Sequence, residues 1–210
     1  MSSRLIYVMD PMCSWCWGFA PVVQALAEQA HAAGVPMQLV VGGLRRERMV
    51  MDCAARERTL SYWHAVHEAS GQPFDLEHGL PEGLVYDTEP ACRALVAARE
   101  LDEPRVWPLA QRIQQAFYAG RCDVTQAQRL VELAGEVGLA RDTFADRFDS
   151  QAIRDATAAD FAWVQNLGIA GFPTLLAEHD GQLALLTNGY QPLAALQPLL
   201  ARWLEHNAHA

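Results

Sequence analysis

The spacing of apolar residues along the chain predicts a mixed α/β fold. The apolar run Leu5–Val8 predicts a short buried strand, about Arg4–Met9. From Cys13 to Ala33 apolar residues recur every three or four positions, which is the spacing of an amphipathic helix. Val35–Val41 is apolar and β-branched, and it predicts a second strand. Strand, helix and strand make a βαβ unit, so we expect the two strands to be parallel.

Pro21 lies inside this first helix pattern, five residues after Cys16. A proline there removes one backbone hydrogen bond and kinks the helix. We therefore expect the packing around the helix to support the kink.

The pattern from Leu44 to about Gln151 is almost wholly helical, apart from an irregular Gly- and Pro-rich stretch at 71–87. Apolar spacing and capping residues predict helices at about 51–70, 88–101, 102–119, 125–138 and 142–148. We interpret residues 44–151 as one compact helical insertion.

The C-terminal part returns to strands after a helix at about 152–167. Asp180-Gly181 between two apolar runs, 173–177 and 183–187, is a strong hairpin signal, so these strands should be antiparallel. A final helix is expected from about Pro192 to Leu204, with a frayed tail at 206–210.

Without the insertion, the order β-α-β and then α-β-β-α resembles that of a thioredoxin fold. The predicted architecture is therefore α/β, with a thioredoxin-like domain formed by residues 1–43 plus 152–205. A helical insertion domain, 44–151, interrupts it after the second strand.

Composition and charge narrow the class of protein. The chain has 210 residues, of which 51% are hydrophobic and 20% charged, as is ordinary for a globular protein. Its formal net charge of -9 argues against nucleic acid or an anionic membrane as a partner, because both attract basic patches. No apolar run approaches the roughly 20 residues of a membrane span, and Leu5–Met9 is too short for a secretory signal. We therefore expect a soluble, cytoplasmic protein.

The stretch Asp10–Phe19 carries the chemistry, because it places a Cys-x-x-Cys motif, Cys13 and Cys16, between a strand and a helix. The first N–H groups of a helix are unpaired and its macrodipole is positive there, which favours a thiolate. Cys13 lies nearest the helix start and is the candidate nucleophile. Cys16, one turn later on the same face, is placed to attack a mixed disulfide and resolve it. The motif predicts two-electron dithiol/disulfide exchange, for which no cofactor is expected.

A zinc site is the main alternative for such a motif. Tetrahedral zinc needs two more ligands, and the chain has no second Cys-x-x-Cys or Cys-x-x-His. His64 and His67 share one helix face but do not form a His-Glu-x-x-His pattern. No metal is therefore expected.

Three further cysteines, Cys53, Cys92 and Cys122, stand alone, and the odd total of five argues against a structural disulfide framework. We interpret each as a small apolar core residue. The open alternatives are that one of them exchanges with Cys13 or Cys16, or that one pairs with another cysteine in an oxidising cell.

Trp15, between the two cysteines, is expected to be exposed and to offer an apolar surface to unfolded or peptide substrates. Trp17 and Phe19 are interpreted as core residues. The charge run Arg45–Arg48 is interpreted as a solvated face, although its place after the second strand could bring it near the active site to bind an acidic group.

Phe172-Pro173-Thr174 is the second candidate element. A proline at the start of a strand can simply mark an edge, and only about one X-Pro bond in twenty is cis. A cis bond would bring the preceding backbone beside the sulfurs, where Phe172 could offer main-chain N–H and C=O groups to an extended substrate. Phe172 and Pro173 are therefore candidate substrate-binding residues.

The stretches Asp10–Phe19 and Gly171–Thr174 together resemble the DsbA-like branch of the thioredoxin superfamily, and more closely its cytoplasmic FrnE-like, disulfide-isomerase-like members. The resemblance implies a thioredoxin fold interrupted by a helical domain, a redox pair at Cys13 and Cys16, and a cis-proline at Pro173. It also implies protein or peptide thiols and disulfides as partners, with glutathione as a further candidate.

Ser14 and Trp15 depart from the Pro-His of the family's periplasmic oxidases, in which the histidine stabilises the thiolate. Neither residue brings a positive charge that would lower the cysteine pKa. Each pKa unit of lowering that is lost corresponds to about 1.4 kcal/mol of thiolate stability, or about 30 mV of reduction potential for a two-electron couple. We therefore expect a reduction potential nearer to reductases or isomerases than to strong oxidases.

Two other functions stay open. Related kappa-class glutathione transferases and chromene-carboxylate isomerases bind glutathione on the same scaffold and typically use a serine nucleophile position. The presence of both Cys13 and Cys16 favours disulfide exchange over that chemistry. A redox-independent, chaperone-like binding module would instead use the helical insertion and the aromatic surface.

Overall fold

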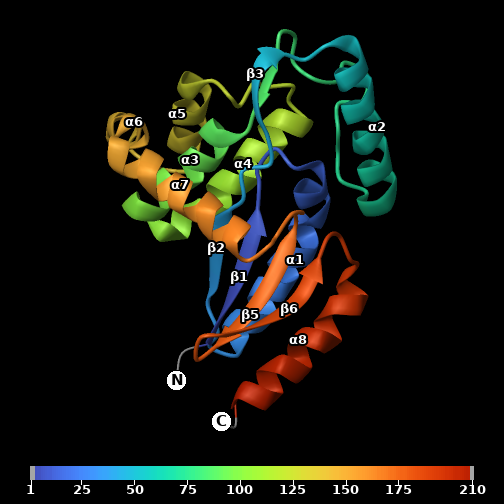
Figure 1. The fold of residues 1–210 in the computed structure, drawn as a ribbon, viewed down its shortest axis with the longest axis vertical. Coiled ribbons are helices and arrows are strands. Elements are labelled where there is room, and N and C mark those ends of the chain that lie inside the picture. Colours follow the sequence, from blue (N-terminus) through green and yellow to red (C-terminus); the bar gives the residue numbers. More distant parts are fainter. Residues whose placement is uncertain (1–2, 209–210) are drawn as a thin grey trace.

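A four-stranded sheet with strand order β2-β1-β5-β6 forms the centre of the computed structural model, which describes residues 3–208 (Figure 1). The parallel pair is β1 (Ser3–Met9) and β2 (Met37–Val41), and α1 (Ser14–Ala32) connects them. β5 (Thr174–His179) is antiparallel both to β1 and to β6 (Gln182–Asn188). The expected α/β, thioredoxin-like architecture is confirmed.

The helices fall close to the expected ranges. They are α2 (Cys53–Ser70), α3 (Glu89–Leu101), the short 3-10 helix η1 (Glu103–Arg105), α4 (Val106–Tyr118), α5 (Ala127–Glu136), α6 (Arg141–Asp149), α7 (Gln151–Asn166) and α8 (Leu193–Ala208). In Figure 1 the helices between β2 and α7 gather at the upper end of the sheet, and both termini lie near its lower end. α8 continues to Ala208, so the predicted fraying is wrong for residues 206–208; residues 209–210 lie outside the described part.

A second, two-stranded sheet is the main departure from the expected helical insertion. β3 (Arg46–Val50) and β4 (Val85–Asp87) pair antiparallel, with an irregular register. Every residue of β3 is exposed, so the strand carries no alternation of buried and exposed positions that a sequence pattern could show. Backbone hydrogen bonds from Thr88 to Arg45 and from Met51 to Leu84 extend the pairing beyond both ends of β3.

The two faces of the central sheet carry different helices. Leu5, Tyr7 and Met9 of β1 point into the large buried cluster that contains the inner faces of α1 and α8. Ile6 and Val8 point the other way and pack with residues of α7. The large cluster continues into α3 and α4, so the sheet and the helical segment share one core.

Pro21 has the support that the sequence predicts it needs. Its missing N–H would leave the carbonyl of Trp17 without a donor in the helix. The Gln72 side chain supplies one, since its Nε2 donates to the Trp17 oxygen at 3.0 Å. The Trp17 indole in turn donates to the carbonyl of Pro73 at 2.9 Å. The loop after α2 is therefore bonded twice to the first turns of α1.

The predicted β5–β6 hairpin is confirmed. Asp180 and Gly181 at its tip have φ of 46° and 80°, the left-handed conformations that a tight hairpin turn requires. Within the described residues, no helix is long and apolar enough to cross a bilayer.

Candidate active site

The two cysteines of the motif lie at the start of α1, as expected. Cys13 is the N-cap residue and is 6% exposed, whereas Cys16, in the first turn, is fully buried. The carbonyl of Cys13 accepts hydrogen bonds from the N–H groups of Cys16 at 3.0 Å and Trp17 at 3.2 Å. Both cysteines are free thiols. The unpaired N–H groups and positive end of α1 therefore face Cys13, the more accessible of the two sulfurs.

The loop before β5 lies against Cys13. The Cys13 thiol donates to the carbonyl oxygen of Phe172, with the sulfur 3.5 Å from that oxygen. The Phe172–Pro173 peptide bond is cis, as the resemblance implied. Phe172 is half-buried and Pro173 is buried. The structure thus brings Cys13, Phe172 and Pro173 together from distant parts of the sequence.

Gly42, just after β2, makes room for this arrangement. A Cβ atom at Gly42 would overlap the ring of Phe172. The N–H of Gly42 donates to the carbonyl of Met9 at 2.8 Å, so its position is set by the end of β1. Phe172 therefore packs directly on the backbone that follows β2.

The complete burial of Cys16 affects the pKa of its thiol. Burial raises the pKa of Cys16 well above its ordinary value, and the hydrogen bond and charge of Cys13 add to the increase. Burial therefore favours the protonated thiol of Cys16. The predicted roles, Cys13 as nucleophile and Cys16 as resolving cysteine, remain predictions.

Asp10 is a buried carboxylate that the sequence reasoning did not assign to the site. It accepts hydrogen bonds from the N–H groups of Met12 at 2.8 Å and Leu44 at 2.6 Å, from the Thr88 hydroxyl, and from the Cys92 thiol at 3.4 Å. Burial raises its pKa, and these donors offset part of the increase. An acidic residue ending an apolar strand, three positions before Cys13, was the available signal. Asp10 joins the start of the motif to the loop after β2 and to α3.

Arg45 lies beside this network. Its guanidinium is 4.8 Å from the ring centre of Tyr86, whose hydroxyl donates to the carbonyl of Met12 at 2.6 Å. The backbone N–H of Thr88 donates to the Arg45 carbonyl at 2.9 Å. One member of the arginine run therefore does lie near the motif.

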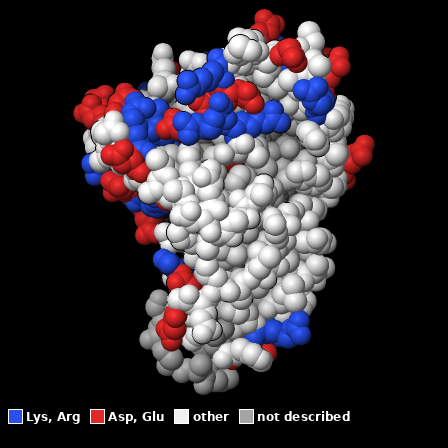
Figure 2. All heavy atoms as spheres, viewed as in Figure 1, with Lys and Arg blue, Asp and Glu red and all other residues white. Residues whose placement is uncertain are grey.

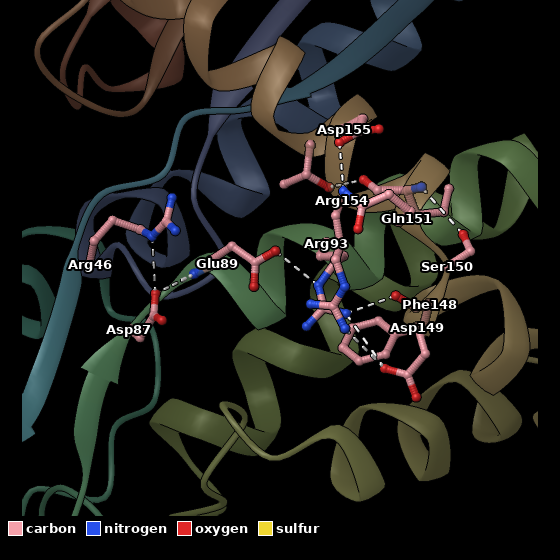
Figure 3. Close-up of polar contacts among 12 residues, drawn as sticks. Arg46, Asp87, Glu89, Arg93, Phe148, Asp149, Ser150, Gln151, Arg154 and Asp155 are labelled. Atoms are coloured by element: carbon pink, nitrogen blue, oxygen red, sulfur yellow. Dashed lines mark hydrogen bonds and ion pairs between the residues drawn. The ribbon is translucent and has the colours of Figure 1, made fainter.

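Arg46, an exposed member of the run, contacts an acidic residue of β4 instead. Arg46 pairs with Asp87 at 3.6 Å; Asp87 accepts a hydrogen bond from the backbone N–H of Glu89, whose side chain pairs with the buried Arg93 (Figure 3). Figure 2 shows a band of basic side chains, with acidic ones among them, across the upper part of the molecule, above a largely uncharged middle region. Arg46 and Arg48 are exposed, so the expected solvated face is confirmed for them.

The aromatic residues of the motif are more enclosed than expected. Trp15 is half-buried, and its ring lies 5.6 Å from that of Tyr190, so the expectation of an exposed Trp15 is corrected. The loop between β6 and α8, which carries Tyr190, covers one side of Trp15. Trp17 and Phe19 are core residues, 7% and 0% exposed, as expected.

The other cysteines differ in burial. Cys92 is fully buried, as expected for a core residue, whereas Cys53 is exposed at the start of α2 and Cys122 is half-buried. The core interpretation is therefore wrong for Cys53. Across the described residues, no group of three or more His, Cys, Asp or Glu side chains could hold a metal ion. His67 is instead bonded to the carbonyl of Gln72 at 2.8 Å.

Comparison with known proteins places this geometry among redox proteins. A model of the DSBA-like thioredoxin domain matches residues 4–201. The crystal structure of a candidate protein disulfide isomerase from Nitrosomonas europaea is 39% identical, with a TM-score of 0.92, and the match covers 98% of this chain and 99% of that one. The cytosolic disulfide reductase DsbM from Pseudomonas aeruginosa is 30% identical, with a TM-score of 0.80, and the match covers 97% and 99% of the two chains.

Two further comparisons concern ligands and more distant relatives. DsbM has also been crystallised with GSH, and that structure is 29% identical with a TM-score of 0.78, covering 96% of this chain and 99% of that one. The ClpXP adapter protein SpxH of Halalkalibacterium halodurans is 21% identical over 177 residues, or 82% of this chain. The match spans only 57% of that protein's length. The enzyme class expected from the sequence, a disulfide oxidoreductase, agrees with these relatives.

Proposed function

The chain belongs to the DsbA-like thioredoxin family, and from this premise we propose that it exchanges disulfides with protein or peptide thiols through Cys13 and Cys16. The observation that carries the proposal is the Cys13 sulfur, located at the start of α1 and 3.5 Å from the Phe172 carbonyl. A sulfur at a helix N-terminus is favoured as a thiolate, the reactive form. The buried Cys16 lies one turn behind it.

The exchange proceeds in two displacements. The Cys13 thiolate attacks one sulfur of a substrate disulfide, forms a mixed disulfide, and releases the other substrate sulfur as a thiolate. Cys16, once deprotonated, attacks Cys13 and releases the remaining substrate thiol. The pair Cys13 and Cys16 is oxidised to a disulfide while the substrate is reduced; the reverse sequence oxidises a substrate dithiol.

We propose Phe172, Pro173 and Trp15 as the substrate-binding residues. An extended substrate segment that reaches Cys13 passes the main chain of Phe172, which can pair with it as a neighbouring strand would. Trp15, two residues after Cys13, offers a partly exposed apolar ring. The ring rests on Tyr190, so Trp15 contributes a fixed apolar edge rather than a mobile one.

Residues 44–151 are proposed to form a helical insertion domain that supports the site in the thioredoxin-like domain, 1–43 plus 152–205. Two contacts support this role, because Tyr86 binds Met12 and Thr88 binds Asp10. The insertion thus holds Asp10 and Met12, two residues of the stretch that leads to Cys13.

We further propose a reductase or isomerase direction and a cytoplasmic location. Neither Ser14 nor Trp15 adds a cation beside Cys13, and a cation there would favour the thiolate and an oxidising potential. The similar DsbM is a cytosolic disulfide reductase. Equilibration of the Cys13–Cys16 pair with glutathione buffers tests the direction, and a strongly oxidising potential would contradict it.

The function itself is tested by insulin reduction and by refolding of scrambled ribonuclease. Cys13→Ala is expected to abolish both activities, and Cys16→Ala to accumulate the protein as a mixed disulfide with substrate. Full activity in Cys13→Ala would reject the proposal. Aggregation suppression that survives replacement of both cysteines would point instead to a chaperone-like module.

Glutathione binding is the second candidate, because the similar DsbM forms a complex with GSH. The reduced tripeptide would occupy the path of a substrate segment past Phe172 and bring its thiol to Cys13. Conjugation of glutathione to an electrophile that persists in Cys16→Ala would favour a transferase. Glutathione that serves only as the reductant of the Cys13–Cys16 disulfide favours exchange.

A further inference from the structure

Tyr7 carries a buried hydroxyl that makes no well-formed hydrogen bond. The residue lies in the middle of β1 and is 1% exposed. Its hydroxyl is among the buried polar atoms of the described residues that have no partner within bonding geometry. A buried hydroxyl without a hydrogen bond lowers the stability of the fold by about 1–3 kcal/mol relative to a bonded one. The presence of the Tyr7 hydroxyl therefore needs a physical explanation.

Tyr7 belongs to the same buried cluster as the two cysteines of the motif. Alternation along β1 turns Tyr7 toward α1, and its ring centre is 6.1 Å from that of Phe19, three residues after Cys16. Stacking on Trp107 of α4, at 5.7 Å and 7° between planes, fixes the ring from the other side. Burial raises the pKa of Tyr7 well above its ordinary value; the charges of Cys16 and then Cys13, and lastly a hydrogen-bond interaction with Cys16, raise it further. The hydroxyl therefore keeps its proton while either sulfur is ionised.

We propose that the Tyr7 hydroxyl donates a hydrogen bond to the Cys16 sulfur when that sulfur becomes a thiolate, and thereby assists the resolving step. The inference rests on the proposed function. In this step a new bond forms between Cys16 and Cys13, and the bond from Cys13 to the substrate sulfur breaks. The proton of Cys16 passes to the departing substrate thiolate or to solvent, and Tyr7 retains its own.

The other polar groups near the motif are less suited to this role. The Tyr86 hydroxyl already donates to Met12, and the Asp10 carboxylate is an acceptor held by four donors. The Tyr118 hydroxyl is also buried without a partner, but after burial the charge of Tyr86, not of a sulfur, raises its pKa most. Tyr7 is thus the unpartnered buried donor whose strongest charged neighbour is Cys16.

The test separates the two displacements by stopped-flow reaction of the reduced protein with Ellman's reagent, a chromogenic aromatic disulfide. Cys53 and Cys122 are first replaced by alanine, because both are accessible. The first release of chromophore reports attack by Cys13 and depends on reagent concentration. The second reports resolution by Cys16 and does not; Cys16→Ala must abolish it.

Tyr7→Phe keeps the ring and removes the donor. We expect it to slow the second phase about tenfold, the effect of one hydrogen bond to a charged group at about 1.4 kcal/mol. The apparent pKa of that phase should rise, and the first phase should keep its rate. Tyr118→Phe, which also removes an unpartnered buried hydroxyl, should change neither phase.

An unchanged second phase and pH profile in Tyr7→Phe would overturn the inference, and so would equal slowing in Tyr118→Phe, which would indicate loosened packing. These results differ from failure of the proposed function. In that case the parent protein itself would show no fast first phase dependent on Cys13 and no second phase, and both proposals would fall.

Discussion

The Cys13 sulfur lies 3.5 Å from the carbonyl oxygen of Phe172, although 159 positions separate the two residues. The pairing of β1 with β5 explains the approach, because Val8 lies opposite Thr174 in the register. The strand that leads into the motif and the strand that follows Pro173 are therefore hydrogen-bonded neighbours. We therefore expect a substrate bound to Cys13 to lie along the Phe172 backbone.

Gly42→Ala should disturb the contact between Cys13 and Phe172, although Gly42 belongs to a different segment, the one that follows β2. A Cβ atom at position 42 overlaps the Phe172 ring, so the ring and the carbonyl attached to it must move away from Cys13. We expect insulin-reduction kcat/KM to fall about tenfold or more, while circular dichroism stays that of the folded protein. Gly42 has no left-handed φ, so backbone strain does not add to the effect.

Gly171→Ala provides the matched control. It adds the same methyl group one residue before Phe172, where the nearest atom, Oδ1 of Asn188, is at an ordinary 3.4 Å. Its kcat/KM should stay within about twofold. Equal losses in Gly42→Ala and Gly171→Ala would mean that the loop tolerates no added methyl, and that the ring overlap is not the cause.

Gln72→Ala should destabilise the start of α1. It leaves the Trp17 carbonyl, already deprived of a helix donor by Pro21, without its Gln72 partner. Losing a partly buried hydrogen bond of this kind costs about 1–2 kcal/mol. Urea unfolding should show that decrease in the free energy of unfolding, whereas Gln24→Ala, on the exposed side of α1, should change it little.

A double-mutant cycle with Pro21→Ala identifies the cause. Alanine at 21 restores an N–H that can bond the Trp17 carbonyl within the helix, so Gln72→Ala should cost much less in that background. Additive effects of the two substitutions would show that Gln72 stabilises the protein by some other contact.

Trp15→His should make the enzyme more oxidising. A histidine beside the Cys13 sulfur can carry a positive charge and so favour the thiolate of the reduced protein. Each 1.4 kcal/mol of that stabilisation raises the reduction potential by about 30 mV. Trp15→Phe, which also loses the indole but adds no charge, should leave the potential near its original value. Equal potentials in the two variants would show that charge at position 15 does not set the potential.

The sequence predicted the elements whose patterns depend on burial. Helices and central strands appeared within a few residues of their expected bounds, because their apolar positions repeat with the period of the element. β3 was missed because its five exposed residues have no such period. The hairpin turn could also be predicted, because Asp180 and Gly181 are residue types that adopt its left-handed conformations.

Some residues of the site could likewise be predicted from the sequence, and others could not. Cys13 and Cys16 could be assigned from their spacing and their place before a helix, and Pro173 from a resemblance. Tyr7 could not, because a tyrosine in an apolar strand has no distinctive spacing; Asp10 left only the signal of an acidic residue after an apolar strand, three positions before Cys13. Their importance depends on what the tertiary fold places around them: two sulfurs around Tyr7, and four donors around Asp10.

Asp10 makes stability depend on pH in a direction opposite to that of a salt-bridged carboxylate. Burial raises its pKa above the ordinary 3.8, so the folded state holds the proton more tightly than the unfolded chain. Its contribution is therefore most favourable below about 3.8 and is lost as pH rises through the raised folded-state pKa. Urea unfolding at a series of pH values should show the stability of the protein falling relative to Asp10→Asn across that window and then levelling. A difference that rises with pH instead would mean that the four hydrogen-bond donors outweigh burial.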